Sequence, residues 1–201
     1  ELYHLVNLPQ EKAFHTFDGW YHTLAVVAHT EPDLTLRWGA LLHDVAKGMP
    51  TIREIINGRL TDRGHDTMGA DMSRELLTRL EYSKSFVDRV VWIVRNHMRF
   101  HYFVTHNEAD AVKWARQEAR SGAFRYAANL TEAWQQLAQV CAADVMGCGK
   151  PHASTDGTLA FGDCMVDISN HMPIHTSDLN YDKRLLTLVA PNVGEMLKLL
   201  L

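Results

Sequence analysis

The chain has 201 residues, of which 46% are hydrophobic, so it can form one well-buried core and does not require two domains. A net charge of −4 argues against a protein that holds nucleic acid by overall charge, although a local basic patch could still do so. The three cysteines, none spaced as CxxC, favour neither a disulfide scaffold nor a thiolate zinc site and fit a reducing cytoplasm.

Targeting signals are not evident in the sequence. No apolar run approaches the roughly 18 residues of a membrane span, and the first residues lack the basic and apolar regions of a signal peptide. We therefore expect a cytoplasmic protein that does not bind membranes. Because the chain starts at Glu1 and stops inside the apolar run 196–201, we also expect it to be a piece of a longer chain.

Apolar residues recur with helical spacing along most of the chain, and no alternating pattern is long enough to predict a strand. Val26 and His29 follow His22 on one face of the first helix, Asp33 caps the second, and Gly48 stops it. The fold class that follows is all-α, a helical bundle. We expect helices over residues 20–30, 34–47, 65–80, 107–119, 163–170 and 191–201, one from residue 83 or 85 to 97, and one from residue 131 to 147 or 149.

Connecting segments complete the predicted organisation. Residues 49–64 are expected to form a polar loop with a short helical turn over 52–56, and Asn107 to cap the helix that follows it. Residues 1–150 would then form the main domain, and residues 151–201 a loop-rich extension that ends in a helix and packs on the same domain.

His43 and Asp44 stand side by side near the end of an apolar, helix-patterned stretch. A carboxylate in such a setting costs several kcal/mol unless a cation or donors compensate it, and the neighbouring imidazole has an open lone pair. A metal ion would satisfy both groups.

Five predicted helices each carry histidine or aspartate on their core-facing side. Imidazole and carboxylate ligands suit manganese, iron, cobalt, nickel or zinc, and the scattered spacing favours a site built between facing helices over a local zinc motif. The predicted ligands are His22, His43, Asp44, His65, His97 and Asp144.

This order of residues resembles the HD-domain superfamily of metal-dependent phosphohydrolases. The resemblance implies that His22, His43, Asp44 and Asp144 hold a first divalent ion and that Asp44 bridges to a second, held by the histidines at 65 and 97. One or two ions of Mn, Ni, Co, Fe or Mg are therefore expected. Lys47 matches a lysine that some members place near the substrate phosphate, and we assign it a catalytic role with Asp44.

Longer segments are similar to the HD region of bacterial tRNA nucleotidyltransferases, the CCA-adding enzymes. The similarity lies at 17–24 (FDGWYHTL), 36–48 (LRWGALLHDVAKG), 63–70 (RGHDTMGA), 96–98 (NHM), 143–147 (ADVMG) and the tail 174–201. The nucleotidyltransferase head, with its Gly-Ser turn and paired aspartates, is not present in these residues, so CCA addition is not assigned to them.

Basic residues form two further candidate sites. Arg53, Arg59 and Arg63, in the loop that borders the predicted ligands, match the geometry of a phosphate, and a solvated loop is the alternative. A second basic stripe either contacts RNA backbone or is a solvated helix face; its members are Lys113, Arg116, Arg120 and Arg125. We interpret His29 and His101 as surface histidines or as neighbours of ligands.

The favoured function is hydrolysis of a phosphomonoester or phosphodiester by metal-activated water. The resemblance implies nucleotides, 2′,3′-cyclic nucleotides or phosphate-ended RNA as substrates. One alternative is the RNA-positioning C-terminal part of a tRNA nucleotidyltransferase, with tRNA as partner and the nucleotidyltransferase domain upstream in the full-length chain. A second alternative is an HD-type di-iron oxygenase, which would use the same six ligands.

Overall fold

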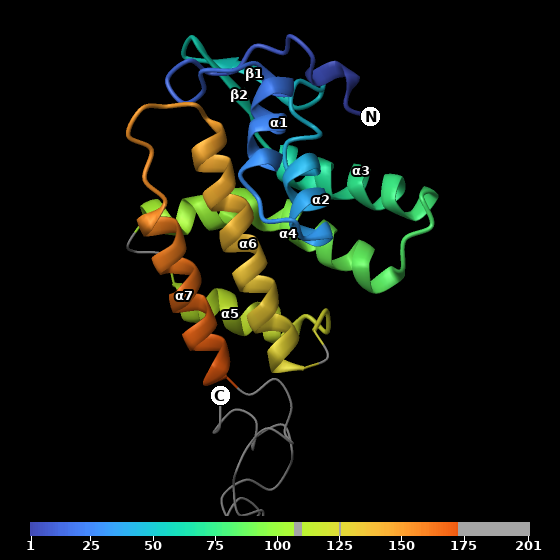
Figure 1. Ribbon diagram of the computed structural model, residues 1–201, viewed down its shortest axis with the longest axis vertical. Helices are drawn as coiled ribbons and strands as arrows, with labels where there is room; N and C mark the ends of the chain where they lie inside the picture. Colours follow the sequence, from blue (N-terminus) through green and yellow to red (C-terminus); the bar gives the residue numbers. More distant parts are fainter. Residues whose placement is uncertain (107–109, 125, 173–201) are drawn as a thin grey trace, which may run out of the picture. The chain divides into compact units, whose positions relative to one another are not determined.

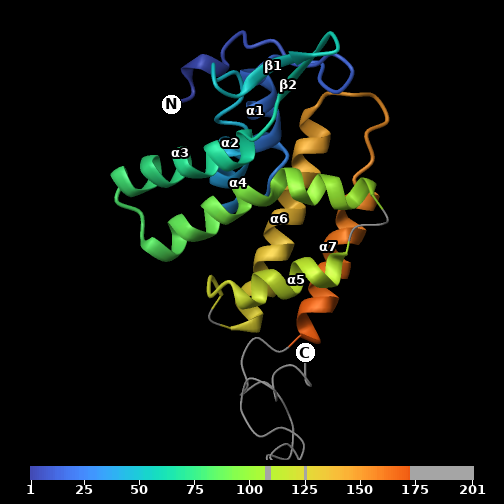
Figure 2. The same cartoon turned by 180° about the vertical axis from the view of Figure 1, so that it is seen from behind.

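The computed structural model describes residues 1–106, 110–124 and 126–172 (Figures 1 and 2). Its elements are η1 (Tyr3–Leu5), α1 (Gly19–Ala28), α2 (Leu34–Leu42), β1 (Arg53–Ile56), β2 (Arg59–Asp62), α3 (His65–Arg79), α4 (Lys84–Thr105), α5 (Ala111–Arg120), α6 (Ala127–Gly147) and α7 (Asp156–Asn170). The all-α prediction is confirmed, and one small hairpin is added to it. The helix expected at 191–201 lies outside the described residues.

The chain divides into two compact units. The first comprises residues 1–109 and 133–164, and the second residues 110–132 and 165–201. Among the described residues, no helix is both long and apolar enough to cross a membrane.

Side-chain caps begin several of the helices. The carboxylates of Asp18, Asp33 and Asp110 accept hydrogen bonds from backbone amides in the first turns of α1, α2 and α5. Asp33 is the predicted cap of its helix. The prediction of Asn107 as the cap of α5 is wrong, because Asp110 provides it, and Asn107 itself lies outside the described residues.

Two helices begin earlier than the spacing predicted. Thr131 was expected to start a helix but lies inside α6, and α7 starts at Asp156 rather than at residue 163. The start of α7 was placed too late because the glycines at 157 and 162 were interpreted as loop residues. Gly162 sits within α7 where a Cβ atom would come 2.4 Å from the Cβ of Ala138, so the missing side chain permits close packing.

Residues 53–62 form an antiparallel hairpin, so the prediction of a loop with a helical turn over 52–56 is wrong. The strands pair Arg53 with Asp62 and Ile56 with Arg59. Asn57 and Gly58 between them have φ values of 51° and 75°, the left-handed conformation that a two-residue hairpin turn requires. The Asn-Gly dipeptide was the sequence signal for this turn.

The core of the first unit lies between α2, α3 and α4, and α3 and α4 lie side by side in both views (Figures 1 and 2). Valines and leucines fill it, and the indole of Trp38 donates to the Tyr82 hydroxyl at 3.1 Å beside it. The buried apolar members of this cluster are Leu42, Val45, Ala70, Leu77, Val87, Val90, Val91 and Val94.

Gly147, the last residue of α6, is in close contact with α1. A Cβ atom there would lie 2.9 Å from the backbone nitrogen of Val26 and 2.5 Å from one of its methyl groups. We predict that Gly147→Ala lowers the free energy of unfolding by about 1–3 kcal/mol, because one helix must move away from the other. Denaturant unfolding measures this. Gly157→Ala is the matched control, since its Cβ would meet only a Val104 methyl at 3.8 Å; equal stability of the two variants would contradict the prediction.

Candidate metal centre

Six imidazole and carboxylate side chains from five parts of the first unit meet in its interior. Four histidines and one aspartate among them are at most 4% exposed, and the sixth side chain, Asp144, is 13% exposed. The structure thus brings together every ligand predicted from the sequence. They are His22 on α1, His43 and Asp44 directly after α2, His65 at the start of α3, His97 on α4 and Asp144 on α6.

Backbone carbonyl groups fix the tautomer of all four histidines. The Nδ1 atoms of His43, His65 and His97 lie 2.6–2.7 Å from the carbonyl oxygen three residues earlier. His22 Nδ1 lies 3.1 Å from the oxygen of Gly147. Because a carbonyl only accepts, each Nδ1 must carry a proton, and each Nε2 is the nitrogen left to face the interior of the site. This orientation is the usual one for imidazoles that bind metals.

The first ligand group consists of His22, His43, Asp44 and Asp144. His22 Nε2 lies 3.3 Å from His43 Nε2, 3.1 Å from Asp144 Oδ1 and 3.4 Å from Asp44 Oδ2. His43 Nε2 lies 3.2 Å from Asp44 Oδ2 and 3.7 Å from Asp144 Oδ1. Four ligand atoms from three helical regions therefore surround one small space.

The second group uses the other oxygen of Asp44. His65 Nε2 lies 3.1 Å from Asp44 Oδ1 and 3.1 Å from His97 Nε2, and His97 Nε2 lies 3.8 Å from the same oxygen. Asp44 thus contributes one oxygen to each group and connects them.

These separations fit bound cations. Metal ions that hold nitrogen and oxygen at about 2.0–2.2 Å leave neighbouring ligand atoms about 2.8–3.6 Å apart. The Nε2 atoms of His22 and His43 lie 3.3 Å apart and those of His65 and His97 3.1 Å apart, which is repulsive unless a proton or a metal ion lies between the two nitrogens. Asp44 Oδ2 is buried and accepts no well-directed hydrogen bond within the described part of the chain. All three observations favour metal ligation.

The charges of the site persist despite burial. Burial opposes ionisation of Asp44, but His43 and Lys47 outweigh it and hold its pKa well below the usual range. The Lys47 ammonium lies 2.7 Å from Asp44 Oδ2, and this carboxylate raises the pKa of Lys47 against its desolvation. Lys47 also donates to Gln10 Oε1 at 3.2 Å. The lysine is therefore a fixed cation beside the bridging carboxylate.

His101 holds the carboxylate of Asp144. Its Nε2 donates to Asp144 Oδ2 at 2.8 Å and leaves Oδ1 for the first ligand group. Burial opposes the charge of Asp144, but hydrogen bonds from His101 and His22 hold its pKa well below the usual range. Against burial, hydrogen bonds to Asp144 and Asp44 raise the pKa of His22 to about 9. Of the two interpretations of His101 made from the sequence, the structure agrees with a neighbour of a ligand rather than a surface histidine.

A pocket of about 780 Å³ opens onto the two ligand groups. Asp44, His65 and Asp144 line it, together with Lys47 and Arg63. Arg63 therefore lines the pocket, and its role in phosphate binding stays a prediction. Pockets of this size accommodate small organic ligands.

The other two arginines of the predicted phosphate site, Arg53 and Arg59, are placed differently. Arg53 forms a paired ion contact with Asp62, at 3.0 and 2.8 Å, and also donates to the carbonyl of Pro9 at 2.7 Å. Its guanidinium therefore fastens the hairpin to the N-terminal segment instead of facing the pocket. Arg59 is exposed on β2 and is not among the residues that line the pocket.

The basic stripe belongs to the second unit. Lys113 and Arg120 are exposed on α5, and Arg116 is half-buried. Arg125 lies outside the described residues. The RNA contact expected of these residues stays a prediction.

His15 and Cys148 form a neutral pair at the pocket that the sequence did not suggest. The His15 Nδ1 atom lies 3.5 Å from the Cys148 sulfur. Burial and Lys47 lower the pKa of His15 to about 4, and burial and Asp144 raise the pKa of Cys148 to about 12. The thiol is therefore protonated when no metal ion is bound, and the ligand atoms of Cys148, His15 and His22 lie close enough together to hold one.

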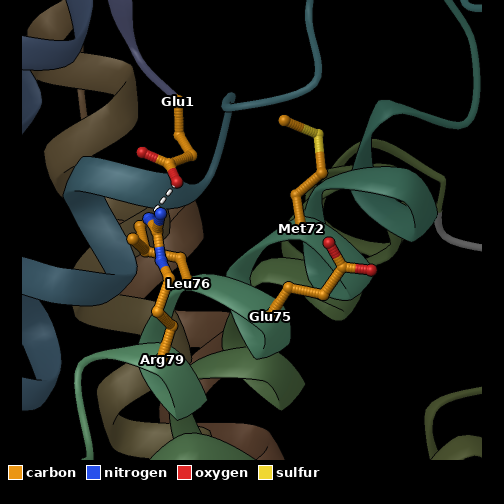
Figure 3. Close-up of a pocket in the computed structure, with 5 residues that line it drawn as sticks. All are labelled: Glu1, Met72, Glu75, Leu76 and Arg79. Carbon is orange, nitrogen blue, oxygen red and sulfur yellow. Dashed lines mark hydrogen bonds and ion pairs between the residues drawn. The ribbon is translucent and has the colours of Figure 1, made fainter.

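A second pocket, of about 250 Å³, lies between the first residue and α3 (Figure 3). The guanidinium of Arg79 is paired with the Glu1 carboxylate, and Met72, Glu75 and Leu76 complete the lining. The lining of this pocket contains no histidine or cysteine.

The two ligand groups predict different losses of metal. We expect His22→Ala to remove one equivalent of manganese, His65→Ala to remove the other, and Asp44→Ala to remove both, because only Asp44 serves both groups. Metal analysis after equilibrium dialysis measures the stoichiometry. Full occupancy in Asp44→Ala would refute the shared carboxylate, and unchanged circular dichroism would show that the variants fold.

The contact between His101 and Asp144 predicts an effect on affinity. His101→Ala should weaken manganese binding about 10- to 100-fold, as expected when a ligand loses the group that orients it. His101→Gln, whose amide can still donate to Asp144, should retain most of the affinity. Isothermal titration calorimetry gives both values. Equal weakening in the two variants would show that the imidazole acts by packing alone.

Comparison with known proteins finds tRNA nucleotidyltransferases among the relatives of this chain. The chain is 36% identical over 90 residues to the A-adding tRNA nucleotidyltransferase of Deinococcus radiodurans, covering 42% of this chain and 21% of the relative. It is 38% identical over 103 residues to the CC-adding tRNA nucleotidyltransferase of Thermus thermophilus, covering 49% of this chain and 24% of the relative. It is 28% identical over 151 residues to the multifunctional CCA protein of Cupriavidus necator, covering 73% of this chain and 34% of the relative. The chain thus spans about a fifth to a third of these relatives' lengths. The HD domain model matches residues 19–130, more than half of the chain, which therefore belongs to the HD domain family.

Proposed function

We propose that this chain is a metal-dependent phosphohydrolase that cleaves a phosphate ester of a nucleotide or of an RNA end, such as a 2′,3′-cyclic phosphate. The observation that supports it best is the carboxylate of Asp44, whose two oxygens lie 3.1–3.4 Å from imidazole nitrogens of two ligand groups. These groups border a pocket that also contains cationic side chains.

Bound at these groups, one or two divalent ions would supply water of lowered pKa and neutralise phosphoryl oxygens. The chain itself supplies positioning and charge. Asp44 stays anionic and would orient the attacking water, and Lys47 beside it would stabilise negative charge on the phosphate. Arg63 lines the same pocket and would bind a further phosphate oxygen through its planar guanidinium.

A second candidate function is positioning of RNA as part of a tRNA nucleotidyltransferase. It is supported by the relatives, whose names describe tRNA nucleotidyltransferases, and by the fraction of their length that this chain spans. Lys113, Arg116 and Arg120 on α5 would contact the phosphate backbone. On this proposal tRNA is the partner and the hydrolytic groups are secondary.

Activity assays separate the two functions. We expect the protein loaded with manganese, nickel or cobalt to release phosphate from nucleotides or to open 2′,3′-cyclic AMP. The His43→Ala/Asp44→Ala double variant should fall to background, because both ligand groups lose members. Lys47→Ala should lower kcat/KM about 100-fold, as for the loss of one charged stabiliser. Lys84→Ala is the control, since Lys84 is an exposed lysine on α4.

Inactivity of the wild-type protein across the metals and substrates would contradict the hydrolase proposal. Retained binding of tRNA in such a sample would favour the RNA-positioning function, and binding lost in Lys113→Ala/Arg116→Ala would place the RNA on α5. Consumption of oxygen by the iron-loaded protein would instead favour the oxygenase alternative.

A further inference from the structure

Large apolar side chains line the same pocket as the charged groups and are left open to solvent. Phe14 is 61% exposed, Tyr102 53% and Met98 42%, and all three border the cavity that contains Asp44 and Lys47. A pocket whose phosphate-binding groups adjoin an aromatic surface suits a ligand that is anionic at one end and flat and apolar at the other.

Two of these three residues lie on α4, the helix that also carries His97. Tyr102 follows the ligand His97 by five residues, which corresponds to about 7.5 Å of helical rise. Met98 and Tyr102 are four residues apart and share a helix face.

The Tyr102 ring is held in place although it is exposed. It stacks on the imidazole of His106 with ring centroids 4.0 Å apart and planes inclined by 17°. His106 Nδ1 in turn lies 2.9 Å from the carbonyl oxygen of Tyr102. A fixed ring loses little conformational freedom when a second ring binds, which favours stacking of a ligand.

We propose that Phe14, Met98 and Tyr102 bind the base of the nucleotide whose phosphate ester lies at the ligand groups. The inference rests on the proposed function and extends it, because it makes the substrate a base-bearing phosphate and assigns its recognition to named residues. Stacking tolerates any base, so the surface selects nucleotides over sugar or glycerol phosphates without selecting among bases.

A pair of substrates with the same reacting group tests this. Adenosine 2′,3′-cyclic phosphate and glycerol 1,2-cyclic phosphate both contain a five-membered cyclic phosphodiester, and only the first has a base. Tyr102→Ala and Phe14→Ala should each raise the KM for the adenosine substrate about 5- to 30-fold, with kcat little changed. Neither should alter kcat/KM for the glycerol substrate.

Conservative variants separate stacking from packing. Tyr102→Phe should keep the wild-type KM, whereas Tyr102→Leu should resemble Tyr102→Ala. Tyr21→Ala removes an aromatic residue that is 63% exposed on α1 and does not line the pocket, so it should have no effect. The proposal would be overturned by equal kcat/KM values for the two substrates. It would also be overturned if neither Phe14→Ala nor Tyr102→Ala changed the KM for the adenosine substrate. Either result would leave the hydrolase function intact.

Binding without turnover keeps the inference testable if no hydrolysis is found. Manganese-loaded protein should bind adenosine 2′-monophosphate in a calorimetric titration, and Tyr102→Ala should weaken this binding about 5- to 30-fold. Such a result in an inactive protein would support the base-binding surface while the hydrolase function failed. Absence of binding to the wild-type protein, or equal binding to the variant, would overturn the inference.

Discussion

The buried carboxylate of Asp44 is the constraint on which the rest of the first unit depends. An anion at 2% exposure is costly unless positive charge and donors surround it. Lys47, three residues later, supplies one cation. Imidazoles from α1, α3 and α4 approach the two carboxylate oxygens of Asp44. Each of these elements must therefore be in place before the carboxylate is compensated. The fold and the candidate metal centre are consequently specified by the same contacts.

The histidines are oriented in two different ways. Those at 43, 65 and 97 each direct Nδ1 to a carbonyl three residues earlier, so local backbone geometry sets their tautomer. His22 uses the carbonyl of Gly147 on α6 instead, at a point where the absence of a side chain lets α6 contact α1. Asp144 comes from the same end of α6 and is held by His101. The first ligand group therefore depends on long-range packing more than the second.

The large pocket combines two kinds of surface that suit one class of ligand. Its polar part consists of carboxylates, imidazoles and the cations Lys47 and Arg63, and its apolar part of Phe14, Met98 and Tyr102. Charge alone would attract many phosphates, whereas the aromatic surface adds a preference for those that carry a base. The charged and the aromatic parts of the pocket together suit the nucleotide or RNA end that we propose as the substrate of this member of the HD domain family.

The sequence alone determined the all-α class through helical spacing. It also determined the order of the candidate ligands, through the cost of placing polar residues in apolar stretches. Both signals depend on neighbours only a few residues apart, so they can be recognised without the tertiary structure. Only the tertiary structure decided the rest. It paired Arg53 with Asp62 rather than with a phosphate, and it placed His101 against Asp144, since those contacts join strands or helices whose register is not encoded in any local period. It also divided the two oxygens of Asp44 between separate histidine groups, an arrangement that arises only when helices distant in sequence pack together.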